Sequence, residues 1–220
     1  MFKALAIILP ISVASTAMGQ VHQDIYVGLA GGAFTIGGIS EDGSVITPGV
    51  RVFGADLGES GVPLFADEPG MQSPDGTFAA GTSLRLNVGR AVRQWNGTDF
   101  LDMSSAVFTI AFGPASFDTP ATDSVVQGFS LVADSEGGLH DHPDYTLSGA
   151  GDGIYLLEMF VDSSTGAYDA SERYWIVFNN NLDEDDHDLA IEWVNDNLVP
   201  TPGVLPLLAG GLLMASRRRR

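Results

Sequence analysis

The sequence predicts an all-β protein: a single antiparallel β-sandwich or jelly-roll-like domain with one short C-terminal helix. Short apolar or alternating segments recur along the chain and are separated by clusters of Gly, Pro, Asp, Asn and Ser, a pattern typical of sandwiches. Most of the 27 glycines fall in these clusters, where turns need positive φ angles. Only one segment, near the C-terminus, has apolar residues at helical spacing.

The expected strands follow one another from the N-terminus without an internal repeat. Each is a run of β-branched, aromatic or aliphatic residues bounded by turn residues. The predicted strands are 24–29, 33–36, 50–53, 83–88, 106–112, 125–132, 154–161 and 174–178.

Two further segments complete the predicted domain. Residues 55–80 contain Asp67-Glu68-Pro69-Gly70 and Pro74-Asp75-Gly76, and we expect them to form a long loop. A helix is predicted from Asp185 onward, with acidic residues in the first turn, where negative charge complements the helix dipole. Its expected buried face consists of Leu189, Ala190, Trp193, Val194 and Leu198.

The first residues have the pattern of a secretory signal peptide. A short basic start, Met1-Phe2-Lys3, precedes an apolar stretch from Ala4 to Val13, and Ala17-Met18-Gly19 offers small residues for cleavage. We therefore expect residues 1–19 to be a signal peptide and the protein to be exported.

The C-terminal segment combines a proline motif, a short apolar stretch and a basic end. Residues 204–216 are apolar but too few for a comfortable membrane span, which needs roughly 20 apolar residues. The terminal arginines would keep this end on the cytoplasmic side of a membrane. The motif and the arginine run consist of Val199, Pro200, Thr201, Pro202, Arg217, Arg218, Arg219 and Arg220.

This segment resembles the PEP-CTERM sorting tag of exported proteins in Gram-negative bacteria. The three parts of the tag occur in order, with Thr201 where the family usually has glutamate. The resemblance implies transient anchoring in the inner membrane, processing by an exosortase-like protease, and delivery to the cell surface or extracellular matrix. The expected organisation is a signal peptide (1–19), an ectodomain (20–198) and a sorting tag (199–220).

The exported part is strongly acidic and contains no cysteine. Without both terminal segments, five arginines and 28 acidic residues remain, a formal charge of −23. Such a surface repels nucleic acid and anionic membranes, attracts cations and favours solubility. Thiol nucleophiles and cysteine-ligated zinc are excluded. The sequence also lacks the common hydrolase, metalloprotease and nucleotide-binding signatures, so we expect a protein that is not an enzyme.

The histidines are the candidate metal ligands. His140 and His142 are alternate residues, so on a strand both imidazoles face the same side and can converge on one ion. Zinc is the expected ion, with His187 as third ligand and His22 or Asp144 completing the shell. The alternative is that His140 and His142 are solvated residues of an acidic turn.

The segment His140-Asp141-His142, followed by the strand Gly153-Ile154-Tyr155, looks like a pair found in bacterial surface-anchored proteins associated with zinc or manganese supply. These proteins include a zinc-regulated PEP-CTERM group, and the resemblance implies a metal-binding role.

Two other ligands are considered. Calcium is a less favoured ion: Asn181, Asp183, Asp185 and Glu192 have the spacing of an EF-hand loop, although Asp186 stands where glycine is needed. An extracellular polysaccharide is the second, for a structural matrix protein without a specific metal site. Sugars could stack on aromatic side chains if these were exposed, although such residues more often form the core; the candidates are Trp95, Tyr145, Tyr155, Tyr174 and Trp175.

Overall fold

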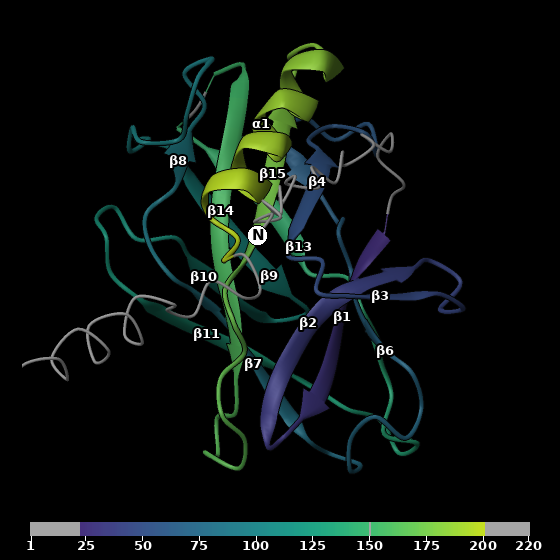
Figure 1. Ribbon diagram of the computed structural model, residues 1–220. Coiled ribbons are helices and arrows are strands. Elements are labelled where there is room, and N and C mark those ends of the chain that lie inside the picture. The colour runs from purple at the N-terminus through teal and green to yellow at the C-terminus, as the bar shows by residue number, and fades with distance from the viewer. Residues whose placement is uncertain (1–22, 150, 201–220) are drawn as a thin grey trace, which may run out of the picture.

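A computed structural model describes residues 23–149 and 151–200 (Figure 1). The expected signal peptide, His22 and the tag from residue 201 onward lie outside the described residues. The described part consists mainly of strands with one helix, which confirms the all-β, sandwich-like fold class. Within this part of the chain, no helix is long and apolar enough to cross a membrane.

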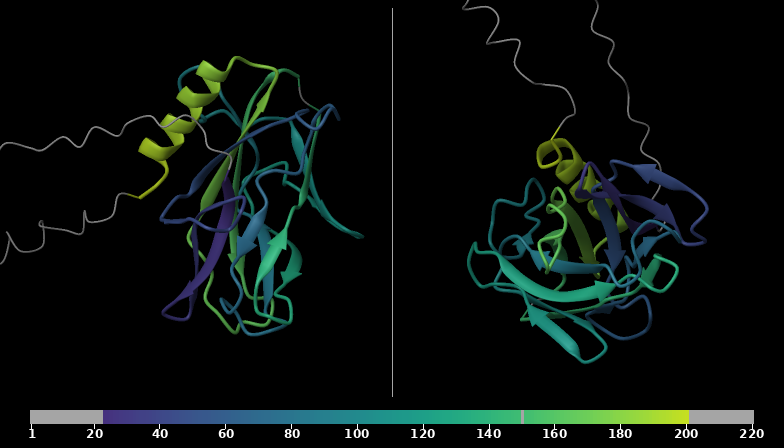
Figure 2. Two further views of the ribbon diagram at one scale, coloured as in Figure 1. Left: turned by 90° about the vertical axis from the view of Figure 1, so that its right-hand side faces the viewer. Right: turned by 90° about the horizontal axis from the view of Figure 1, so that it is seen from below.

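The strands form three sheets (Figures 1 and 2). The five-stranded sheet has the order β12 (Leu139–Asp141), β6 (Met71–Ser73), β1 (Gln23–Ala30), β2 (Ala33–Ser40) and β3 (Ile46–Pro48). The four-stranded sheet has the order β10 (Ala115–Asp118), β9 (Val107–Phe112), β13 (Asp144–Ser148) and β5 (Phe65–Ala66). The six-stranded sheet has the order β11 (Val126–Val132), β7 (Ser83–Val88), β14 (Gly153–Asp162), β15 (Tyr174–Asn180) and β4 (Val52–Asp56), with β8 (Arg93–Gln94) paired to β14.

The six-stranded sheet is buried on both faces at its centre. All seven residues of β15 are buried. Because side chains alternate along a strand, Tyr174, Ile176 and Phe178 enter the main core, to which all three sheets contribute, whereas Trp175 and Val177 enter a second cluster on the opposite face. The unbroken apolar run at residues 174–178 of β15 therefore reflects a strand with no solvent-facing side.

The helix α1 (Glu184–Asn197) covers this second face of the sheet. Figure 1 shows it lying across β14 and β15, and Ala190 and Val194 are fully buried in the cluster that contains Trp175 and Val177. Its first turn carries Glu184, Asp185 and Asp186, as the sequence predicts.

One residue of the predicted helix face is wrongly placed. The buried helix residues are His187, Ala190 and Val194, whereas Leu189 is 55 % exposed. Successive helical residues are rotated by about 100°, so a face centred on Ala190 and Val194 leaves Leu189 outside it.

Two other expectations need correction. Residues 55–80 are not a structureless loop, because β5 and β6 lie within them. Strands of two and three residues are too short to show an alternating pattern, and they exist because tertiary partners pair with them. The sheets are also not entirely antiparallel, since β1 pairs with β6 and β15 with β4 in parallel.

Each of the five arginines in the described residues lies within ion-pair distance of a carboxylate. The pairs are Arg51 with Glu172, Arg85 with Asp162, Arg93 with Asp123, and both Arg90 and Arg173 with Glu158. All 28 acidic residues belong to the described part, so most of them have no arginine partner. The surface is therefore negative without internal compensation.

The best-formed of these pairs gives a stability prediction. Arg85 donates from Nε and Nη2 to the two oxygens of Asp162, both at 2.8 Å, across the β7–β14 register. The Arg85 hydrogen bonds hold the pKa of Asp162 below its usual range. A lowered pKa stabilises the fold above the unfolded-state pKa, and this contribution disappears as the pH falls. We expect Asp162→Asn to lower the free energy of unfolding by about 1 kcal/mol at pH 7.

Urea denaturation at several pH values measures this effect. The difference between the wild type and Asp162→Asn should shrink below about pH 4, where unpaired carboxyl groups protonate. Asp144→Asn, an exposed carboxylate at the start of β13, serves as control and should change stability little. An equal loss in both variants would contradict a specific contribution of the Arg85 pair.

Candidate metal centre

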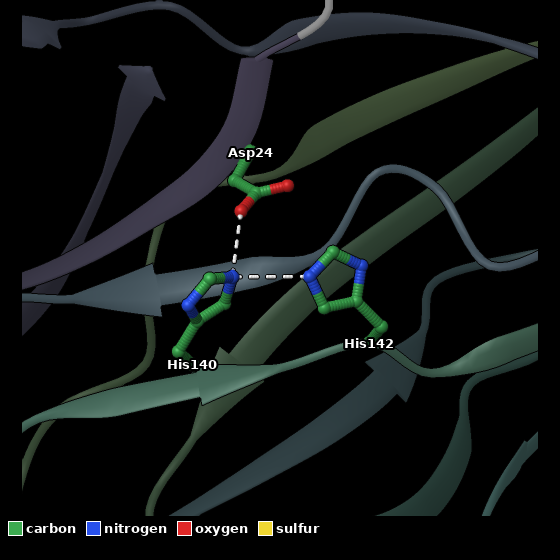
Figure 3. Close-up of side chains that lie close together, drawn as sticks. All are labelled: Asp24, His140 and His142. Atoms are coloured by element: carbon green, nitrogen blue, oxygen red, sulfur yellow. Dashed lines mark hydrogen bonds and ion pairs between the residues drawn. The ribbon is translucent and has the colours of Figure 1, made fainter. Parts of the chain in front are cut away.

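His140 and His142 lie side by side at the edge of the five-stranded sheet (Figure 3). His140 is the central residue of β12, and His142 follows the end of that strand. Their Nε2 atoms are 3.1 Å apart. The alternation that places both imidazoles on one side of an extended chain thus brings two ring nitrogens to one point.

Asp24 of β1 faces the same point (Figure 3). Its Oδ2 atom lies 3.5 Å from Nε2 of His140, and its Oδ1 accepts a hydrogen bond from the Gly70 N–H at 3.0 Å. The residue is 1 % exposed, and Oδ2 has no hydrogen-bond partner among the described residues. A buried carboxylate is costly unless a cation or hydrogen bonds compensate it. This oxygen therefore needs a hydrogen-bond donor or a cation, and a metal ion bound here would supply the cation.

Gly70 makes this convergence possible. Strand β6 lies between β1 and β12, so these two strands are roughly 9.6 Å apart. Gly70 immediately precedes β6 and accepts the Ile25 N–H at 2.9 Å. A Cβ atom at position 70 would lie 2.7 Å from Cε1 of His142 and 2.8 Å from Oδ1 of Asp24. Two of the three candidate ligands, Asp24 and His142, thus approach each other over a backbone position that has no side chain.

The other nitrogen of His142 is held by the chain segment before Gly70. Its Nδ1 lies 3.1 Å from the Asp67 carbonyl oxygen and 3.3 Å from Oε1 of Glu68. Since a carbonyl only accepts, Nδ1 carries the hydrogen, and in the neutral ring the lone pair then lies on Nε2, towards His140. Metal-ligating histidines usually have such an outer partner, which fixes the ring tautomer and orientation.

The surroundings of the cluster are negative and partly buried. Burial raises the pKa of the Glu68 carboxyl, and the charge of Asp24 adds to this, although the Gly70 N–H and His142 act in the opposite direction. Burial also raises the pKa of the Tyr145 hydroxyl, with smaller contributions from the charges of Glu68 and Asp24. A cation bound at the cluster would lower the pKa of both groups.

The spacing of the three ligand atoms fits a tetrahedral ion. Zinc binds imidazole nitrogen and carboxylate oxygen at about 2.0–2.2 Å, so two ligand atoms of a tetrahedral site lie roughly 3.3 Å apart. The distances here are 3.1 Å between the imidazoles and 3.5 Å between His140 and Asp24. All three ligand atoms lie within 4.8 Å of one another, and a fourth position would be left for water or an added ligand.

The structure does not bring the remaining predicted ligands to this site. His187 is buried in the first turn of α1, where it groups with Asp56 and Glu184, because that helix packs on the six-stranded sheet. Asp144 is exposed at the start of β13 in the four-stranded sheet and is not part of the cluster. The structure therefore places His187 and Asp144 apart from the pair His140 and His142, and His22 lies outside the described residues.

Sequence reasoning missed Asp24, Glu68 and Gly70. Asp24 carried a usable signal, because an acidic residue stands at the start of a strand whose next residues, Ile25 and Val27, are fully buried. Glu68 and Gly70 carried none, since their segment resembles an ordinary turn.

The residues considered for calcium lie at the start of the helix and within it. The structure places Asp183 at the N-cap of α1 and both Asp185 and Glu192 within the helix, while the side chain of Asn181 donates to Asp152. These residues do not surround a loop, so the acidic run is a helix start.

The aromatic residues considered for sugar stacking mostly form the core. Tyr145, Tyr155, Tyr174 and Trp175 are at most 4 % exposed. Trp95 is partly exposed and packs against Phe100 and Trp193, with ring centroids 5.1 and 6.2 Å away. The described residues thus offer no stacking platform built from this set.

Comparison of the chain with protein-family models, with curated proteins and with solved structures found no match.

The role of Gly70 gives a test that leaves every ligand unchanged. We expect Gly70→Ala to weaken zinc binding at the cluster at least about tenfold, the usual effect of displacing the groups that orient metal ligands. Titration calorimetry measures this affinity. Gly151→Ala is the matched control, since a Cβ there meets no atom within 4 Å. Wild-type affinity in Gly70→Ala would show that Asp24 and His142 do not act together.

Proposed function

We propose that this chain is an exported, non-enzymatic protein of the cell surface or extracellular matrix that binds a divalent transition-metal ion through Asp24, His140 and His142. The observation that carries the proposal is the meeting of two imidazole nitrogens, 3.1 Å apart, with a buried carboxylate oxygen that has no hydrogen-bond partner in the described part of the chain.

The ligand chemistry favours zinc. Imidazole nitrogen suits zinc, copper, nickel and iron, whereas magnesium and calcium prefer oxygen ligands. Two imidazoles and one carboxylate are a common zinc-binding set, and zinc accepts an open fourth position.

The acidic surface supports loading of such a site. A shallow cleft is lined by five carboxylate residues together with Ser60 and Ala66, and one of the five, Glu68, contacts His142; the five are Glu41, Asp56, Glu59, Asp67 and Glu68. Clefts lined by one sign of charge concentrate the opposite ion. The local cation concentration beside the cluster should therefore exceed that of the medium.

The exposure of the ligands supports reversible capture. The side chains of His140 and His142 are 49 % and 35 % exposed, so an ion can enter and leave without unfolding of the sheet. With three protein ligands, the fourth position stays accessible to water or to a ligand from another molecule. This arrangement suits a protein that takes up metal at the surface and passes it on.

The export part of the proposal is based on the two terminal segments and on their resemblance to a signal peptide and a PEP-CTERM tag. An exosortase-like protease is the implied partner, and the inner membrane is a transient location. The absence of cysteine makes the metal site insensitive to an oxidising exterior.

Zinc titration tests the metal site. We expect His140→Ala/His142→Ala to reduce the zinc stoichiometry by one ion per chain, and Asp144→Asn, an exposed carboxylate near them, to leave it unchanged. Binding at this site should also weaken below about pH 6, because protonated imidazoles cannot ligate a metal. An unchanged isotherm in the double variant would mean that Asp24, His140 and His142 do not hold the zinc that binds.

Mass spectrometry of the protein isolated from its native cell surface tests export and sorting. We expect an N-terminus near residue 20 and loss of Arg217 to Arg220. A protein that retains these arginines would refute processing of the tag, while leaving the metal site untouched.

A further inference from the structure

We propose that Asp56, Glu184 and His187 form a second, separate transition-metal site, which joins the start of α1 to the end of β4. The candidate ligand atoms of these three residues lie within 4.8 Å of one another. The site shares no residue with the cluster of Asp24, His140 and His142, called the Asp24 cluster below, and does not depend on it.

The orphaned nitrogen of His187 is the main observation. The residue is 1 % exposed, and its Nε2 lies 2.9 Å from the carbonyl oxygen of Val177 in β15. A carbonyl only accepts, so Nε2 carries a hydrogen, and in the neutral ring Nδ1 carries the lone pair. Nδ1 is buried and has no hydrogen-bond partner among the described residues. A buried acceptor without a partner costs free energy that a bound ion would recover.

The same contact orients the ring for metal binding. A ligating imidazole commonly donates its other N–H to a backbone carbonyl, which fixes the tautomer and direction of the free nitrogen. The contact of His187 with Val177 has this form. Nδ1 lies 3.7 Å from Oε2 of Glu184, too far for a hydrogen bond but close to the spacing of two ligands on one ion.

The position of the carboxylates follows from the fold. Glu184 and His187 are three residues apart on α1 and therefore share a face. Asp56 ends β4, which pairs in parallel with β15, and α1 packs against both strands. The helix thus carries two ligands to the strand end that provides the third.

Charge also favours a cation at this helix terminus. The helix dipole places roughly half a positive charge there. Two carboxylates in the site and the nearby Asp185 and Asp186 outweigh it. Asp56 also lines the acidic cleft that includes Glu68, so both sites lie beside the same cation-attracting surface. The imidazole nitrogen favours a transition metal such as zinc over calcium.

The test uses the His140→Ala/His142→Ala background, in which the Asp24 cluster is disabled and remaining zinc binding reports the second site. Glu184→Gln is the informative addition, because this side chain is 58 % exposed and its replacement should not affect folding. Asp185→Asn is the matched control, since it removes the same charge from the same helical turn but is not a ligand. Circular dichroism verifies folding of each variant.

We expect the background variant to bind one zinc ion, Glu184→Gln to lower that affinity at least about tenfold, and Asp185→Asn to change it less than about twofold. Zinc should also slow hydrogen exchange of the amides in the first turns of α1, and Glu184→Gln should abolish this protection. No zinc binding in the background, or equal losses in both added variants, would overturn the second site.

The two sites can fail independently. If the background variant binds as many zinc ions as the wild type, the Asp24 cluster is not a site, while the comparison of Glu184→Gln with Asp185→Asn still decides the second one.

Discussion

The fold depends on burial of β14 and β15 on both faces. Tyr174, Ile176 and Phe178 require the other two sheets on one side, and Trp175 and Val177 require α1 on the other. A sheet covered on both sides cannot tolerate a solvent-exposed gap, because apolar burial is the dominant stabilising contribution. This constraint places the first turn of α1 against the end of β4 and packs the smaller sheets against the main core. It therefore also determines where the polar side chains of the two histidine groups come together.

The imidazole rings of His142 and His187 have the same kinds of partners, although the two residues lie on different secondary-structure elements. In each, one ring nitrogen faces a backbone carbonyl, Asp67 for His142 and Val177 for His187, and the other faces groups that include a carboxylate. The Asp24 cluster is built across three neighbouring strands and needs a missing side chain at Gly70. The His187 group is built on one helical turn and a strand end. The former is accessible at the surface, whereas the latter is fixed by a buried ring.

Charge links both groups to the rest of the molecule. The five arginines of the described residues are engaged in ion pairs, and four of these five pairs involve carboxylates on or beside β14 and β15: Glu158, Asp162 and Glu172. The arginine side chains are therefore engaged in ion pairs with other carboxylates and do not neutralise Asp24, Glu68, Asp56 or Glu184. The uncompensated carboxylates attract cations from outside, which is the physical basis for regarding the histidines as ligands.

The sequence by itself determined the fold class, eight of the strands, the acidic start of the helix and the convergence of His140 and His142, because all of these depend on local periodicity and composition. The eight strands are β1, β2, β4, β7, β9, β11, β14 and β15. The sequence could not show β5 and β6, which are too short to carry a pattern, or the exposure of Leu189, which depends on where the helix contacts the sheet. Only the tertiary structure decided that Asp24 and Gly70 join His140 and His142, and that His187 belongs elsewhere. Strand pairing makes neighbours of strands that are distant in the chain, and a helix docks where apolar surface must be covered. Local residue spacing predicts neither the pairing nor the docking position.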